Sequence, residues 1–174
     1  MGNYPPNVTF YLRVYLRGTK EELGIKIREK EWERFRNNTV NLEGDEEVHH
    51  FFSCDTIDGK HIAVNLKKIQ AVNVLEEISH YVEDSTVYRG PIKILFQERN
   101  EYIEVPSTTE PEQLYDCFNC LENGPEFAGN YISFPDDDDE EMIINMDELL
   151  YIEAPQSLTD KGWELYTKDM RSED

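Results

Sequence analysis

Residues 51–75, FFSCDTIDGKHIAVNLKKIQAVNVL, decide the fold of this chain. Two largely apolar runs, 51–57 and 60–66, are separated by Asp58-Gly59. An Asp-Gly pair in this setting predicts a β-hairpin with a type I′ turn, in which both central residues have positive φ. A short turn after Leu66 then leads the chain into a further strand at 69–75.

The same pattern returns eighty residues later, as YISFPDDDDEEMIINMDELLYIEAP at 131–155. The offset is constant in five segments, which pair 12–16 with 92–96, 23–25 with 103–105, 35 with 115, 51–53 with 131–133 and 62–66 with 142–146. Five segments in one register are rare by chance, so the pattern predicts a tandem duplication. We expect a first unit at 1–78, an ordered connection at 79–90, a second unit at 91–155 and a tail at 156–174.

Each unit opens with two strands, because apolar and polar residues alternate at 8–16 and 23–27, and again at 91–97 and 101–105. A helix follows at 30–38, without a good N-cap, and another follows Thr109, which has the capping-box spacing to Glu112. The predicted order is β-β-α-β-β-β, or β-β-α-β-β if the last two strands are one bent strand. The fold class is α+β, mainly β. Either each unit forms a small sheet or barrel-like body with one helix, or edge strands join the units into one sheet.

Asn65 and Asn145 occupy the same place in the two units. Because Asn side chains bond nearby backbone groups at turns, a structural role is favoured over a duplicated ligand contact. Residues 51–75 also resemble the pattern of strand, Asn-Leu-x-x-Ile and strand in small bacterial β-barrels. The resemblance covers about 25 residues and implies a bacterial protein, with no known chemistry.

The formal net charge of −20 is unevenly placed along the 174 residues. Residues 1–80 hold 11 Lys/Arg against 13 Asp/Glu, and residues 81–174 hold 6 against 24. Such a surface repels phosphate backbones and anionic membranes, so we expect no nucleic-acid or membrane partner. The sequence has no apolar run of membrane-spanning length and no secretory signal, and its three cysteines fit a reducing compartment. The expected location is the cytoplasm.

Cysteine and histidine offer two weak candidate sites. Cys117-x-x-Cys120 has a metal or redox spacing, but only Cys54, His49, His50, His61 and His80 remain to complete four zinc ligands. Packing of these cysteines on an apolar helix face is therefore favoured. His50 and Cys54 share a face of the predicted strand, but no third group that would make them a nucleophilic pair is evident. We predict no cofactor and no resident metal.

The six carboxylates from Asp136 to Glu141 lack the spacing of an EF-hand, so a solvated hairpin tip is favoured over a Ca²⁺ site. Phosphate-binding and hydrolase motifs are also missing from the sequence, which lowers the odds of catalysis.

The tail predicts a short helix capped by Thr159 that presents Trp163, Leu165 and Tyr166 to the chain's own body or to another subunit. Aromatic residues are favoured at interfaces. The leading hypothesis is therefore a non-catalytic protein-binding or assembly protein that binds other proteins or itself, with a homodimer favoured by exposed strand edges. The alternatives are an acidic mimic of nucleic acid that binds a basic protein, and a metal-binding protein or enzyme with its site between the units.

Overall fold

The computed structural model describes residues 7–40, 50–79, 87–123 and 130–172, and every structural statement concerns these residues. The elements are β1 Asn7–Leu16, β2 Glu22–Arg28, α1 Glu29–Asn37, β3 Phe51–Asp55, β4 Lys60–Asn65, a 3-10 turn Leu66–Lys68, β5 Ile69–Ser79, β6 Ile92–Phe96, β7 Ile103–Val105, α2 Pro111–Asn123, β8 Tyr131–Pro135, β9 Glu141–Asn145, β10 Leu149–Pro155 and α3 Gln156–Ser172. The α+β class with a majority of strand is confirmed. Both halves have the order β-β-α-β-β-β.

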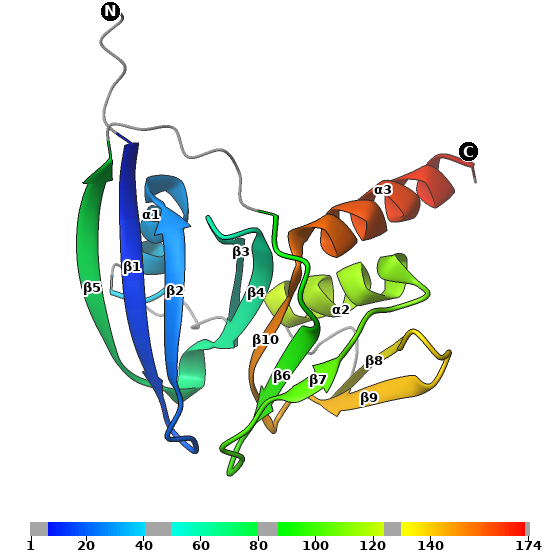
Figure 1. Ribbon diagram of the computed structural model, residues 1–174, viewed down its shortest axis with the longest axis horizontal. Coiled ribbons are helices and arrows are strands. Elements are labelled where there is room, and N and C mark those ends of the chain that lie inside the picture. The colour runs from blue at the N-terminus through cyan, green and yellow to red at the C-terminus, as the bar shows by residue number, and fades with distance from the viewer. Residues whose placement is uncertain (1–6, 41–49, 80–86, 124–129, 173–174) are drawn as a thin grey trace, which may run out of the picture.

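The strands form three sheets, ordered β2-β1-β5, β3-β4-β10-β6-β7 and β8-β9. None is closed, so the barrel-like expectation is wrong for the described chain. The central five-stranded sheet joins strands of both halves through the pairing of β4 with β10. The halves are thus joined by edge strands, but the ten described strands form three sheets rather than the one continuous sheet of the second expected arrangement. The β2-β1-β5 sheet lies on one side of it, and α2 and α3 lie together on the other, next to β8 and β9 (Figure 1).

Two apolar cores use opposite faces of the central sheet. Because neighbouring residues of a strand point to opposite faces, Phe52 and Val64 pack with β1, β2 and α1, whereas Phe51 and Ala63 pack with α2. The first core also takes Tyr151 from the second half. Each half therefore needs side chains of the other to complete its core.

Strand registers recur at the offset of eighty residues. The matching pairs are Leu12–Ile25 and Ile92–Val105, Val14–Val72 and Ile94–Ile152, and Phe51–Asn65 and Tyr131–Asn145. The irregularity of β1 against β5 between Tyr15 and Leu16 also has its counterpart, between Leu149 and Tyr151 of β10 against β6. The halves thus share their element order, pairings and one pairing irregularity.

The predicted type I′ turn is wrong, because of the two central residues Asp58 and Gly59 only Gly59 has positive φ, at 82°. The N–H of Thr56 donates to the carbonyl of Lys60 at 2.8 Å, which leaves a three-residue loop that ends in a left-handed residue. In the second half Asp139 takes that place, with φ 61°. A three-residue loop shifts the hairpin register by one position relative to a two-residue loop.

Three further boundaries differ from the expectation. β5 continues to Ser79, into the predicted connection, of which 80–86 lies outside the described residues. The Thr109–Glu112 capping box is wrong, because α2 begins at Pro111 and its N-cap position is therefore Glu110, while the Thr109 hydroxyl donates to Asp139 at 2.6 Å. The tail helix starts at Gln156, so Thr159 lies inside it, where its buried hydroxyl donates to the carbonyl of Gln156 at 3.0 Å. α1 has no side-chain cap.

Candidate functional site

The outer edge of β5 is the longest unpaired strand edge in the described residues. β5 has 11 residues and pairs only with β1. Its counterpart β10 is buried at every residue, whereas Val74, Leu75 and Ile78 of β5 are exposed, Leu75 by 53% and Ile78 by 61%. An apolar edge with backbone donors and acceptors facing outward is a template for another strand.

Within the described ranges β9 pairs only with β8, so its outer edge is unpaired as well. Ile143 on this strand is 63% exposed, although its counterpart in the first half, Ala63, is completely buried. Tyr131 on β8 is exposed as well, while its counterpart Phe51 is buried in the core under α2. The exposed face of the β8–β9 hairpin therefore corresponds to the face of the β3–β4 hairpin that packs under α2.

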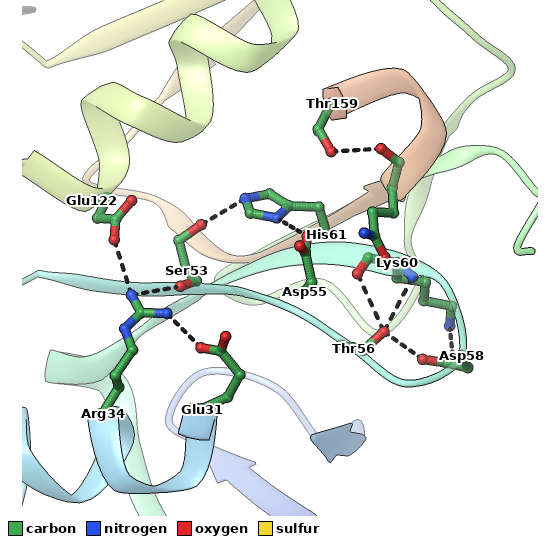
Figure 2. A network of polar contacts seen from close by, with 11 residues as sticks. Glu31, Arg34, Ser53, Asp55, Thr56, Asp58, Lys60, His61, Glu122 and Thr159 are labelled. Atoms are coloured by element: carbon green, nitrogen blue, oxygen red, sulfur yellow. Dashed lines mark hydrogen bonds and ion pairs between the residues drawn. The ribbon is translucent and has the colours of Figure 1, made fainter. Parts of the chain in front are cut away.

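A chain of hydrogen bonds in the order Asp, His and Ser runs across the β3–β4 hairpin (Figure 2). His61 Nδ1 lies 2.7 Å from Asp55 Oδ1, and His61 Nε2 lies 2.9 Å from the Ser53 hydroxyl. Asp55 and His61 are direct cross-strand partners. Sequence reasoning missed this constellation, which the correct loop length would have revealed.

The environment of that network is closed and tightly packed. Ser53 is only 3% exposed, and the ring of Phe118 from α2 packs edge-on against His61 with centroids 4.7 Å apart. Hydrolysis by a serine needs an open approach to the hydroxyl and donors for an oxyanion. The Ser53 hydroxyl is buried, so the hydrogen bonds of Asp55, His61 and Ser53 link β3 to β4, and the Phe118 ring packs this hairpin against α2.

Arg34 of α1 extends this network between the halves. Its Nη2 atom donates to the Ser53 carbonyl at 3.3 Å and to Glu122 of α2 at 3.1 Å, and its other terminal nitrogen pairs with Glu31 (Figure 2). A guanidinium has donors enough for all three acceptors. One side chain therefore links α1, β3 and α2.

Cys117 and Cys120 lie one turn apart on α2, and Cys54 lies on β3. Cys117 is buried, donates to the Ser133 carbonyl at 3.2 Å and has a thiol pKa raised by burial, and Cys120 is partly exposed. Cys54 is buried in the first core, and burial raises its pKa also, which disfavours the nucleophilic thiolate. His50 lies beside Lys67, 3.1 Å from Nε2 to Nζ. No group of three metal-ligating side chains occurs in the part of the chain that the structure describes, and His49 and His80 lie outside it.

Both asparagines of the repeat cap the turn that follows their strand. The Oδ1 of Asn65 accepts from the N–H of Lys67, and that of Asn145 from the N–H of Asp147, each at 3.1 Å. Asn65 also donates to the carbonyl of Leu149, at 2.9 Å, across the junction of the halves. These contacts use the amides for backbone groups rather than for a ligand.

The acidic run lies at the β8–β9 turn. Asp136 Oδ1 accepts from the N–H groups of Asp138 and Glu140 at 2.8 and 2.9 Å, while the carboxylates from Asp137 to Glu141 are exposed. The first carboxylate of the run is therefore occupied by the turn itself.

α3 docks on the chain's own α2. Gly162 faces the carbonyl of Pro111, and the rings of Tyr115 and Tyr166 lie 5.6 Å apart. Of the predicted interaction residues, Leu165 is partly buried, Tyr166 is at the margin of this contact and Trp163 is 52% exposed. The outer face of α3 thus presents Trp163 and Met170.

Comparison with known proteins finds no matching family model, no matching curated protein and no matching solved structure. No helix in the described residues has the length and apolarity to cross a membrane.

Proposed function

We propose that this chain is a non-catalytic assembly protein that binds a protein partner by strand addition. The observation that carries the proposal is the outer edge of β5, where Val74, Leu75 and Ile78 are exposed along an unpaired strand. In strand addition, backbone hydrogen bonds supply affinity and alternate side chains supply specificity. The three apolar side chains and the 11-residue length suit such a partner.

The polar network supports a structural reading of the interior. Arg34, Ser53 and His61 hold α1, the β3–β4 hairpin and α2 together, and the Ser53 hydroxyl is buried. Binding at the surface is then the activity that the exposed groups favour. A bacterial cytoplasmic location fits the acidic charge and the free thiols.

We also propose that the halves arose by tandem duplication. Registers that match at one constant offset, and the matching irregularity of β5 and β10, support a common origin. Duplication explains why a strand edge that is paired in one half is unpaired in the other. Each unit has the same two outer edges, and within one chain only the edge of β4 and the edge of β10 pair with each other.

Site-specific photo-crosslinking in living cells tests the binding function. A photoreactive residue at position 75, on the β5 edge, should give discrete adducts with protein. The matched control carries it at Met170, which is 59% exposed on α3, and should give few. Absence of adducts at position 75, or equal yields at the two positions, would reject strand addition at β5. Discrete adducts at position 170 alone would instead assign binding to the aromatic tail.

A further inference from the structure

The pairing of β4 with β10 uses one edge from each half. β4 offers the edge that faces away from β3, and β10 offers the edge that faces away from β6. At the offset of eighty residues, β9 corresponds to β4 and β5 corresponds to β10. Among the unpaired edges of the described strands, those of β5 and β9 are therefore the two that match a contact which the chain already makes once. They lie toward opposite ends of the molecule (Figure 1), beyond reach of each other within one copy.

We infer that a second copy of this chain is the partner, and that β9 of one copy pairs antiparallel with β5 of the next in the register of β4 and β10. This inference rests on the proposed function and names its partner. The internal contact sets Ala63 opposite Ile152 and Ile62 opposite Glu153. The transferred register sets Ile143 opposite Val72 and Met142 opposite Asn73.

Side chains are compatible with this register. The five transferred pairs are Ile144–Ala71, Ile143–Val72, Met142–Asn73, Glu141–Val74 and Glu140–Leu75. Within these five pairs no acidic residue faces another, which matters because like charges in opposing positions destabilise a sheet. The internal contact continues one step further, where the Gln156 N–H donates to the Gly59 carbonyl at 2.9 Å, and the transferred step sets Glu76 opposite Asp139, which weakens the contact. The pairing would cover Ile143 at a position where the first half buries Ala63.

The contact between copies should be weaker than the internal one. Phe118 of α2 packs on His61 of the β3–β4 hairpin, but the corresponding position at the end of α1 is Asn38, which is polar. The net charge of −20 on each copy also opposes association. Added salt screens that repulsion, so we expect self-association to strengthen with ionic strength.

The contact is heterologous, since each copy supplies one β5 edge and one β9 edge. Heterologous contacts close into rings or continue as open chains. Rings and open chains both differ from an isologous dimer in one testable respect. In a heterologous assembly, a copy that keeps only its β5 edge still binds a copy that keeps only its β9 edge.

Cysteine crosslinking of full-length chains tests the register. In a Cys120→Ser background, Val72→Cys and Ile143→Cys are prepared as separate chains, and Cys54 and Cys117 stay buried. Opposing residues in an antiparallel pair are within disulfide distance. A disulfide dimer should form under oxidation when the two chains are mixed, and either chain alone should give little. Mixing Leu75→Cys with Ile143→Cys is the out-of-register control and should also give little.

Two results would overturn the inference. Dimers of Val72→Cys alone, without a crosslink in the mixture, would mean that β5 pairs with β5; the proposed β5 binding function would then survive. No crosslink in the mixture, together with a strict monomer by sedimentation at high salt, would reject self-association. Photo-adducts with other proteins at position 75 would still support the proposed function in that case.

A charge exchange tests the same register by affinity. Leu75→Glu sets two carboxylates opposite each other at Glu140 and should weaken self-association about fivefold per contact. Adding Glu140→Lys to that variant should restore the wild-type association constant. Met170→Glu adds the same charge on α3 and should have little effect at high salt. An equal effect of Leu75→Glu and Met170→Glu, or failure of Glu140→Lys to rescue, would contradict this register.

Discussion

The N–H of Glu98 donates to the carbonyl of Gly18 at 2.6 Å, and both residues have positive φ, 63° and 90°. They hold equivalent places, eighty residues apart, in the turns of the β1–β2 and β6–β7 hairpins. The Thr19 hydroxyl also donates to the carbonyl of Arg99, at 3.2 Å. The two hairpin tips therefore meet turn to turn and give the halves a second junction besides the pairing of β4 with β10.

Glu98→Gly should raise the free energy of unfolding by about 0.5 kcal/mol. A left-handed conformation costs a non-glycine residue about 1–2 kcal/mol, and the added freedom of the unfolded chain takes back part of that gain. Gly18→Ala should lower the free energy of unfolding by about 1 kcal/mol, because alanine is strained at positive φ. Urea denaturation measures both, with Arg99→Gly, at a neighbour without positive φ, as the control that should destabilise. Equal losses for Glu98→Gly and Arg99→Gly would contradict the prediction.

Gly162→Ala should loosen α3 from α2. A Cβ at position 162 would lie 2.2 Å from the Pro111 carbonyl oxygen, which belongs to rigid backbone. Overpacking of this kind costs about 1–3 kcal/mol. We expect faster amide hydrogen exchange in α3 and a change in Trp163 fluorescence. Ser157→Ala, at an exposed position of the same helix, is the matched control, and equal exchange rates in the two variants would count against the close contact.

Lys60→Met should destabilise the junction of the halves. Lys60 Nζ lies 2.9 Å from the carboxylate of Glu153, which is buried in the central sheet. Removing the cation leaves a buried charge unpaired, at a cost of about 3 kcal/mol. The double variant Lys60→Met with Glu153→Leu should recover most of that loss, because no charge then remains in the interior. Thermal and urea unfolding check this, and a double variant as unstable as the single one would refute it.

Tyr102 should make the fold sensitive to alkali. Burial, followed by the charges of Glu153 and Glu21, raises the pKa of Tyr102 to about 12. A raised pKa means that the fold favours the neutral phenol, so its contribution is complete below the unfolded pKa near 10 and is lost as the pH rises through the folded value. Because Tyr102 is partly exposed, solvent screens part of this effect, and the loss should reach about 1 kcal/mol near pH 12.

Tyr102→Phe is the matching control for that pH dependence. It removes the ionisable hydroxyl, so its stability should fall less between pH 9 and pH 12 than that of the wild type, while the two proteins should be similar at pH 8. Urea denaturation across this range gives the comparison. Parallel curves for the two proteins would exclude Tyr102 as the cause.

The sequence predicted the elements well, because alternation in β1 and helical spacing in α2 are local signals. It failed at Asp58-Gly59, where the turn has three residues instead of two. With a two-residue turn, Asp55 would lie opposite Ile62, and the register that joins it to His61 would not be found. An error of one residue in the loop length therefore prevented prediction of the Asp55–His61–Ser53 contacts from the sequence.

Local sequence patterns also did not predict which side chains are buried, which strand edges pair and where the tail helix packs. Ala63 and Ile143 are both apolar residues in equivalent strands, yet one is buried and the other is exposed. Which edge pairs with which depends on the chain path between the halves, and periodicity carries no information about that path. The same holds for the tail, whose apolar spacing predicted a helix but whose docking on α2 depends on the close approach at Gly162.

The pairing of β4 with β10 has a consequence for synthesis. The first core needs Leu150 and Tyr151, and the central sheet needs β10, so neither is complete until residues near 155 have left the ribosome. Until then a nascent chain exposes the β4 edge as well as the β5 edge. Pairings between distant segments slow folding, and unpaired edges invite association with other nascent chains. On a polysome, where several nascent copies lie close together, the pairing of β4 with β10 within one chain therefore competes with strand pairing between chains.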